Sequence, residues 1–318
     1  MYHRFSARIK SRATKKTNKE KTVAIKSNLT NRAGLTGPAF LFIIALKRTE
    51  TESIILVDKL EFDGGICMNI TQTFYDNLAT QYDKLFLDWQ SATREQATIL
   101  NKLFQDNGFD HRAQILDCAC GIGTQAIGLA CLGYDVTASD ISSGEIAEAK
   151  ARAKNRNVKI RFELADFCAL SETFTEQFDI VIAMDNALPH MLSREDLERA
   201  IRSITNQMKE NGMFVGSIRD YDALLKDKPP YSPPYIHKTD HGQRVSFQTW
   251  DWNEDHYKLV QYIIDDHEPL KISKFECAYR ATRREEMTNL FIKSGCKHVV
   301  WLFPEETGFY QPIVIARK

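Results

Sequence analysis

The stretch that most constrains this chain is residues 115–125, which read Ile-Leu-Asp-Cys-Ala-Cys-Gly-Ile-Gly-Thr-Gln. An apolar run ends at Asp117, a turn containing Gly121 and Gly123 follows, and a helical pattern begins at Thr124. Glycine lets the backbone approach a ligand closely, and the N-terminus of a helix offers unpaired N–H groups. The segment therefore predicts a strand, a turn and a helix that together hold a nucleoside-bearing cofactor.

Strand and helix patterns alternate around this segment. The expected strands are apolar runs that end near a polar residue, namely residues 113–117, 135–140, 158–166, 178–185 and 213–219. Helical patterns separate most of these strands, and the last one covers residues 193–210 and ends at Asn211-Gly212. Such alternation predicts right-handed βαβ units around a parallel sheet.

The pattern changes after Arg219. A loop rich in proline and tyrosine covers residues 229–235, and three β-rich runs with no helix between them follow at 244–252, 256–265 and 271–280. Consecutive strands without helices predict an antiparallel meander. We expect this insertion, residues 220–281, to cover the substrate.

Charge is distributed unevenly along the 318 residues. Residues 1–30 hold nine of the 42 Lys and Arg residues but one of the 42 Asp and Glu residues, which leaves 33 basic against 41 acidic residues in the rest. Phosphate neutralisation dominates affinity for nucleic acids, so an acidic body argues against DNA or RNA as a partner. We interpret residues 1–67 as a basic, disordered extension or an organellar presequence, and Met68 as the start of the domain 68–318.

Cysteine usage and hydropathy indicate the cellular compartment of the protein. The chain has seven cysteines, an odd number, and most lie in apolar runs, which favours reduced thiols in a cytoplasmic setting. Cys118 and Cys120 lack the spacing of a zinc site, so no metal is expected. The apolar run 39–46 is far shorter than the roughly 20 residues of a membrane span, so no membrane is expected as a partner.

Charged side chains end several of the expected strands. They are Asp117, Asp140, Asp166, Asp185 and Arg219. The carboxyl ends of parallel strands line one crevice, where ligands of such sheets bind. Asp140 suits the two hydroxyls of a ribose, and Asp166 suits an adenine amino group, with Phe167 as a stacking face.

Two cofactors compete for this crevice. Gly121, Gly123 and Ala126 also meet the loose dinucleotide pattern, and Asp140 lies roughly where that pattern requires an acid. S-adenosylmethionine is favoured because Asp117 stands four residues before the first glycine, where a zwitterionic amino acid tail can use it. An aromatic helix also precedes the first strand, and two strands close the chain after the final helix.

With these motifs, the chain from Met68 to Lys318 resembles the class I S-adenosylmethionine-dependent methyltransferases. Within them it is most similar to the glycine and sarcosine N-methyltransferases. Three segments carry the resemblance: 116–124, Asp185-Asn-Ala-Leu-Pro-His-Met191 and Ser217-Ile-Arg-Asp-Tyr-Asp222. The resemblance implies a Rossmann-like α/β fold with a mostly parallel seven-stranded sheet, an antiparallel last strand, and the meander inserted after the fifth strand.

The resemblance also implies roles for individual residues. Arg219 corresponds to the arginine that holds the substrate carboxylate, and Asn186 and His190 correspond to the motif after the fourth strand. The implied cofactor set adds residues near the N-terminus to the strand-end positions, and comprises Tyr82, Arg94, Asp117, Ala119, Gly121, Gly123, Asp140, Ile141, Asp166, Phe167 and Met184.

The expected activity is methyl transfer to a small molecule, most simply the amino group of glycine, sarcosine or a similar amino acid. Other small amines, carboxylates or hydroxyls remain open as acceptors. An NAD-dependent oxidoreductase remains open as an alternative activity. The alternative outside the enzymes is a protein that binds the cofactor without catalysing a reaction. For His190, packing at a helix start competes with a role at the substrate. A small-molecule substrate is the expected partner, and homo-oligomerisation stays open.

Overall fold

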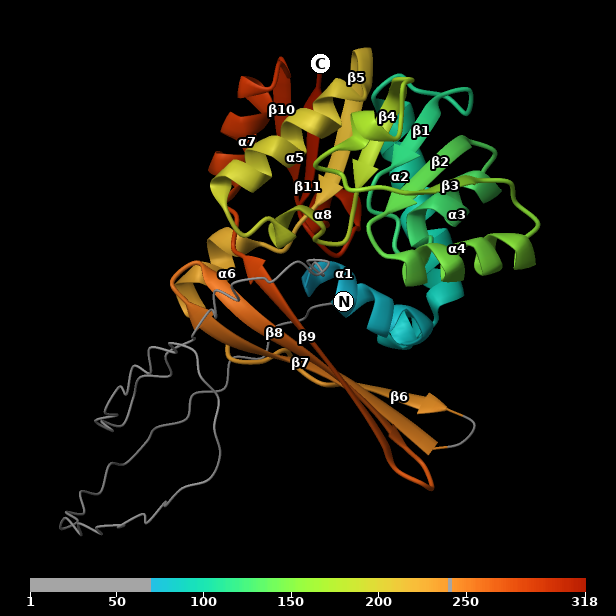
Figure 1. The fold of residues 1–318 in the computed structure, drawn as a ribbon, viewed down its shortest axis with the longest axis vertical. Coiled ribbons are helices and arrows are strands. Elements are labelled where there is room, and N and C mark those ends of the chain that lie inside the picture. The colour runs from blue at the N-terminus through green and yellow to red at the C-terminus, as the bar shows by residue number, and fades with distance from the viewer. Residues whose placement is uncertain (1–69, 240–241) are drawn as a thin grey trace, which may run out of the picture. The chain divides into compact units, whose positions relative to one another are not determined.

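The computed structural model describes residues 70–239 and 242–318, and its larger sheet has seven strands (Figure 1). In spatial order they are β10 (His298–Leu302), β11 (Ile313–Arg317), β5 (Met208–Ser217), β4 (Phe178–Ala183), β1 (Gln114–Asp117), β2 (Asp135–Asp140) and β3 (Arg161–Leu164). From β5 to β3 all neighbours are parallel, whereas β11 is antiparallel to both β5 and β10. The predicted sheet with an antiparallel last strand is confirmed.

The strand order reverses at β1. The chain moves outward from β1 through β2 to β3 and then returns to β4 on the other side of β1. Asp117 pairs in register with Ala138 of β2 and with Ile182 of β4. The carboxyl end of β1 therefore lies at the switch in strand order, where open α/β sheets bind ligands.

Helices cover both faces of this sheet (Figure 1). They are α1 (Ile70–Leu78), η1 (Ala79–Leu85), α2 (Trp89–Asp106), α3 (Thr124–Cys131), α4 (Ser143–Asn155), η2 (Leu170–Glu172), η3 (Leu188–His190), α5 (Arg194–Asn206), α6 (Tyr221–Asp227), α7 (Arg284–Lys293) and α8 (Pro304–Thr307). Because side chains alternate along a strand, Ile115 packs in a cluster with α2 and α3, while Leu116 packs in another with α5 and α7. The two apolar layers fix the sheet between its helices.

A second, antiparallel sheet follows α6. Its strands are β6 (Tyr235–Thr239), β7 (Gly242–Asn253), β8 (His256–Asp266) and β9 (Lys271–Arg280). The three predicted β-rich runs correspond to β7, β8 and β9, and β6 is an additional strand at the edge. Tyr257, Leu259 and Ile263 of β8 alternate along the strand and join the same apolar cluster as α5 and α7. The meander therefore shares its core with the larger sheet.

Several element boundaries differ from the predictions, since β3, β4 and β5 all end before the predicted residue and β5 begins earlier. The helix expected over residues 193–210 ends at Asn206, because the next residues already belong to β5. Asn211, with φ 63°, lies inside β5, where the register with β4 shifts between Phe178 and Ile180. The Asn-Gly pair thus marks a bulge and not a helix end. Strand β3 ends at Leu164, so Asp166 follows the strand at a distance of two residues.

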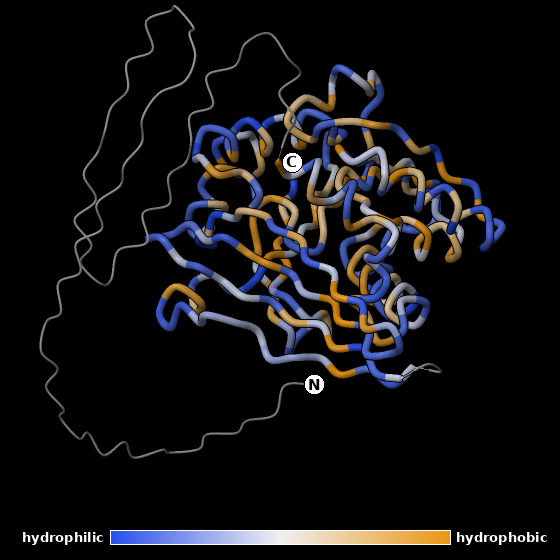
Figure 2. The backbone as a smooth tube through the Cα atoms, turned by 60° about the horizontal axis from the view of Figure 1, so that its bottom comes forward, coloured by the Kyte–Doolittle hydropathy of each residue, from blue (hydrophilic) through white to orange (hydrophobic). Residues whose placement is uncertain are grey.

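Figure 2 shows hydrophobic and hydrophilic stretches alternating along the backbone, as expected for elements that bury one face. Within 70–239 and 242–318, no helix combines the length and apolar character needed to cross a membrane. The extension predicted over residues 1–67 lies outside the described residues.

Candidate functional site

The glycine turn after β1 depends on its two glycines. Gly121 and Gly123 have φ of 51° and 88°, in the left-handed region that favours glycine. A Cβ atom on Gly123 would lie 2.8 Å from Ile127 Cδ1, and one on Gly121 would lie 3.3 Å from Glu145 Oε2. The turn therefore brings bare backbone to the carboxyl end of β1.

Asp140 holds this turn in place. Its Oδ2 accepts a hydrogen bond from Gly121 N at 2.8 Å, and its Oδ1 accepts one from Ser142 N at 2.9 Å. Each oxygen keeps a further lone pair. Asp140 therefore organises the glycine turn from the end of β2.

Acidic side chains gather at this edge of the sheet. Asp117, Asp140 and Glu145 are buried, and Asp185 is half-buried. Burial, as the main cause, raises the pKa of all four carboxyl groups. Asp117 Oδ2 has no hydrogen-bond partner among the described residues. Such a group of desolvated acids favours a cationic ligand.

A strained turn follows β4. Asp185 and Asn186 both have positive φ, 55° and 73°, which is uncommon for residues other than glycine. The conformation is fixed by Ser217, whose Oγ and O accept hydrogen bonds from the backbone N–H groups of Asp185 and Asn186. The end of β5 thus holds the two side chains of this turn at the switch in strand order.

The two side chains of the turn serve different neighbours. Asp185 accepts hydrogen bonds from Tyr310 Oη at 2.7 Å and from Gln125 Nε2 at 2.8 Å. Asn186 Oδ1 accepts from Arg219 N at 3.1 Å and from Tyr221 Oη at 3.0 Å. Asn186 Nδ2 is buried without a partner among the described residues. That donor is available to a ligand.

Arg219 lies just beyond the end of β5, against the second sheet. Its guanidinium donates to Tyr257 Oη at 2.6 Å and to Gln248 Oε1 at 3.0 Å. Its Cζ lies 5.1 Å from the ring centroid of Trp250 and 5.4 Å from that of Tyr279. Both distances are within the range of a cation–π contact.

Among the residues that the structure describes, no acidic side chain pairs with this arginine. Its sequence neighbours Asp220 and Asp222 pair instead with Arg284, at 2.5 Å and 3.3 Å. Within the described part of the chain, Arg219 forms no ion pair. Burial acts to lower the pKa of Arg219, but Tyr257 and the neighbouring tyrosines outweigh that effect and raise it, so the side chain stays cationic. A half-buried, uncompensated guanidinium is a receptor for an anion.

His190 is packed against the same aromatic residues. Its Nε2 shares a 2.8 Å hydrogen bond with Tyr75 Oη, and its ring lies 4.1 Å from that of Tyr279. Burial lowers the pKa of His190 to about 3. The imidazole is therefore neutral at physiological pH, which suits packing and orientation of Tyr75 better than accepting a proton.

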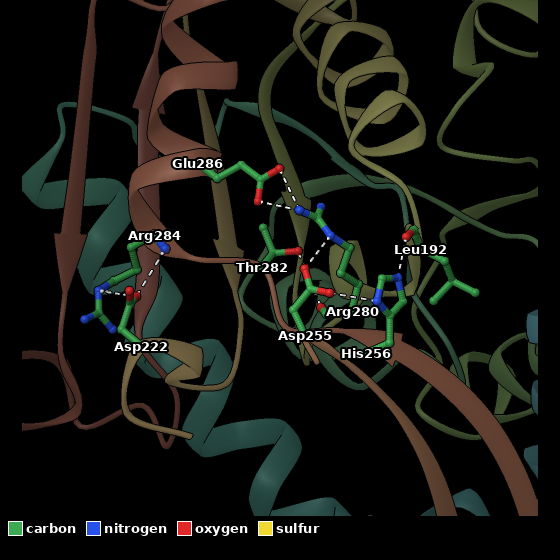
Figure 3. Close-up of polar contacts among 8 residues, drawn as sticks. All are labelled: Leu192, Asp222, Asp255, His256, Arg280, Thr282, Arg284 and Glu286. Carbon is green, nitrogen blue, oxygen red and sulfur yellow. Dashed lines mark hydrogen bonds and ion pairs between the residues drawn. The ribbon is translucent and has the colours of Figure 1, made fainter. Parts of the chain in front are cut away.

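Figure 3 shows polar contacts around the second sheet, some of which reach α7 and the segment before α5. Arg280 of β9 donates to Asp255 in the β7–β8 turn and to both oxygens of Glu286 in α7. His256 Nε2 lies 2.8 Å from the carbonyl oxygen of Leu192, in the segment before α5. These contacts hold the rings around Arg219 in a fixed position.

The structure brings many of the predicted residues to this edge of the sheet. Tyr82 of η1 lies near Asp185, Glu145 and Asp140, whose charges contribute to its raised pKa after the effect of burial. Ala119 is half-buried, and its N–H donates to Asp117 Oδ1 at 3.4 Å. Ile141 is half-buried directly after β2, and Met184 is buried in the apolar cluster of α2 and α3.

Arg94 and Asp166 are the predicted residues that are exposed. Arg94 is exposed on α2, and its Nη2 donates to Ser91 Oγ. Asp166 is exposed, and its Oδ1 accepts from the N–H of Cys168; Phe167 between them is half-buried. Asp166 directly follows Ala165, whose N–H donates to the carbonyl oxygen of Asp140 at 3.0 Å.

Several residues of the site were missed by the sequence reasoning. They are polar or aromatic side chains from distant segments, namely Tyr75, Gln96, Gln125, Gln248, Tyr257, Tyr279 and Tyr310. Gln125 directly follows Thr124 in the first motif and is a buried polar residue in an apolar helix, which was a usable signal. The tyrosines carried no motif. In the described ranges no cluster of His, Cys, Asp and Glu has the arrangement of a metal site.

Comparison with known proteins agrees with this geometry. Residues 115–212 match a family model described as a methyltransferase domain. A glycine/sarcosine N-methyltransferase of Parasynechococcus marenigrum is 28% identical over 155 residues, which cover 49% of this chain and 54% of that protein. A glycine N-methyltransferase of Oryctolagus cuniculus is 25% identical over 262 residues, covering 74% of this chain and 88% of that protein.

Among solved structures, an S-adenosylmethionine-dependent methyltransferase from Clostridium acetobutylicum superimposes with a TM-score of 0.61 at 18% identity. The match covers 76% of this chain and 97% of the other, and it shows the shared fold. The chain spans about half the length of the first curated relatives it matches. The family match and the fold confirm the resemblance predicted from the sequence.

Proposed function

We propose that this chain, which carries a methyltransferase domain, transfers a methyl group from S-adenosylmethionine to the amino group of a small amino acid, with glycine and sarcosine as the first candidates. The observation that supports an amino acid as the acceptor is the environment of Arg219. Its cation lacks an acidic partner in the described ranges, and Trp250, Tyr257 and Tyr279 surround it. An arginine in such a place binds a carboxylate through two parallel hydrogen bonds.

The acids at the ends of β1, β2 and β4 suit the cofactor. S-adenosylmethionine carries a sulfonium and an α-ammonium group, and these charges complement the carboxyl groups of Asp117, Asp140 and Asp185. The unpaired buried Oδ2 of Asp117 and the side-chain-free turn at Gly121 are features that a ligand of this kind completes. When bound, the cofactor supplies a methyl group that its sulfonium has already activated.

Little acid or base strength is then required of the protein. Arg219 holds the acceptor carboxylate, and the unpaired Nδ2 of Asn186 offers a second donor beside it. Together they direct the amine of the acceptor, and such positioning is worth roughly 7–11 kcal/mol of barrier. His190 acts as a positioning residue that orients Tyr75, since its low pKa makes it a poor proton acceptor.

The test is turnover of methyl-labelled S-adenosylmethionine with matched acceptors. Glycine and glycinamide share the same amine, but only glycine carries a carboxylate. We expect transfer to glycine and little transfer to glycinamide. Equal turnover of both would overturn the role of Arg219. Binding of S-adenosylhomocysteine without turnover of any amine would indicate a binding protein, and no binding at all would overturn the cofactor.

A further inference from the structure

Helix α4 begins with a capping pattern that is only half formed. Ser142 is its N-cap, and Glu145 follows at the spacing of a capping box. Ser142 Oγ accepts from Glu145 N at 3.1 Å, as that motif requires. The reciprocal bond, from Ser142 N to the Glu145 carboxylate, does not form, because Ser142 N donates to Asp140 Oδ1. Competition from Asp140 therefore releases the Glu145 side chain from the helix cap.

The released carboxyl group is buried and unpaired. Glu145 is 0% exposed, and neither of its side-chain oxygens has a hydrogen-bond partner among the described residues. The nearby cation Arg152 pairs with Asp83 and Glu148 instead. Burying a carboxyl group without a partner is costly, so native proteins do so rarely, and a bound ligand is one explanation for such a group.

The position of Glu145 indicates which ligand. Its Oε2 lies 3.3 Å from where a Cβ of Gly121 would be, and Gly121 N donates to Asp140 Oδ2. Glu145 and Asp140 therefore both adjoin the glycine turn. Both Asp140 oxygens already accept a backbone N–H, whereas both Glu145 oxygens are free. Asp140 keeps one lone pair on each oxygen for the two hydroxyl donors of a ribose, and the unpaired oxygens of Glu145 offer further acceptors beside the same turn.

We propose that Glu145 is a second carboxyl group for the ribose of the cofactor and binds one of its hydroxyls beside Asp140. This inference rests on the proposed function, since it takes S-adenosylmethionine as the ligand. It assigns the selection of a ribose with an intact diol to Asp140 and Glu145 together. Glu145 thus contributes to cofactor binding and not to the stability of helix α4.

The test compares Glu145→Leu with Glu148→Leu, a matched loss of one acid on the next turn of the same helix. Calorimetry measures binding of S-adenosylhomocysteine and of its 2′-deoxy and 3′-deoxy analogues. We expect Glu145→Leu to weaken S-adenosylhomocysteine by about 10-fold or more, and to weaken one deoxy analogue by less than about 2-fold. Glu148→Leu should leave all affinities unchanged.

The melting temperature without ligand provides the second readout. Replacing an unpaired buried acid with an apolar side chain should leave this temperature unchanged or raise it. A lower melting temperature with unchanged affinity, or an equal loss for all three ligands, would overturn the proposal. If Glu145→Leu does not fold, Glu145→Gln replaces it, with a smaller loss expected in the same direction. Failure of the wild-type protein to bind S-adenosylhomocysteine would overturn both proposals, whereas equally tight binding by wild type and variant would overturn this one alone.

Discussion

The two sides of the crevice are built in opposite ways. The proposed cofactor side, at the ends of β1 and β2, is acidic and consists of residues 117–145 held by backbone N–H groups. The proposed acceptor side, at the end of β5, is cationic and aromatic, and its side chains hold one another across long sequence distances. For example, the single hydroxyl of Tyr257 contacts both Arg219 and Tyr221.

This difference separates two kinds of specificity. A site made of backbone and short-range contacts keeps its form when distant segments change. A site made of interlocking side chains changes whenever one strand of the meander changes. The cofactor side is therefore expected to be general and the acceptor side particular to this protein. The following experiments test whether the two sides are in fact independent.

The largest effect is expected for Arg219→Lys. Lysine keeps the charge but loses the planar pair of donors, so kcat/KM for glycine should fall by about 100-fold. Affinity for S-adenosylhomocysteine, measured by calorimetry, should stay within about 2-fold of wild type. Arg112→Lys is the control, because Arg112 is exposed and pairs only with Asp110. A parallel loss of cofactor affinity would show that the two sides are coupled.

Asp140→Asn should affect the other side. An amide cannot accept from both Gly121 N and Ser142 N and still serve a ribose, so S-adenosylhomocysteine should bind about 30-fold more weakly. The KM for glycine at saturating cofactor should change little. Calorimetry and steady-state kinetics give the two values. Unchanged cofactor affinity would contradict a role for Asp140 in binding the cofactor.

His190 should produce a pH dependence of stability. Its pKa is about 3 in the folded protein and near 6.5 when unfolded, so the unfolded state binds more protons between these values. Stability then rises with pH across this window, by at most about 1.4 kcal/mol per pH unit. Urea unfolding of wild type and His190→Asn at several pH values measures the slope.

The buried carboxyl groups act with the opposite sign, since their pKa values are raised by folding. They are present in both proteins and cancel in the difference between them. We expect the free energy of unfolding of His190→Asn to rise less steeply with pH than that of the wild type. Identical slopes would mean that His190 titrates alike in the folded and unfolded states.

The smallest effect is expected for Tyr257→Phe. The variant removes the hydroxyl that contacts Arg219 and Tyr221 but keeps the ring, so the KM for glycine should rise about 5-fold. Tyr262→Phe, on the same strand with its ring against Phe247, is the control and should leave KM unchanged. Equal effects of the two variants would refute a specific role for the Tyr257 hydroxyl.

Local sequence patterns specify the proposed cofactor side more fully than the proposed acceptor side, for a physical reason. Asp117, the glycine turn and Asp140 are specified by local patterns, whereas Tyr257 and Tyr279 meet Arg219 only after β8 and β9 have paired. Residues two apart on a helix point to different faces, which explains why Gln96 faces Gln125 while Arg94 faces solvent. An alignment by resemblance was too loose to separate them.

Two features could not be predicted from local patterns at all. The positive φ angles of Asp185 and Asn186 depend on hydrogen bonds to Ser217, a residue on a neighbouring strand. The unpaired state of Glu145 depends on Asp140 taking the Ser142 N–H that a capping box would use. In each case a tertiary contact overrides a local preference.

The turn at Asp185 and Asn186 has a practical consequence for redesign. Asp185 contacts Gln125 and Asn186 contacts Tyr221, and both share one strained backbone turn, so a replacement that relaxes this turn is expected to disturb both sides at once. Branched residues such as valine are also poorly compatible with its backbone. Efforts to exchange the methylated compound should therefore graft strands β7 to β9 and leave this junction intact.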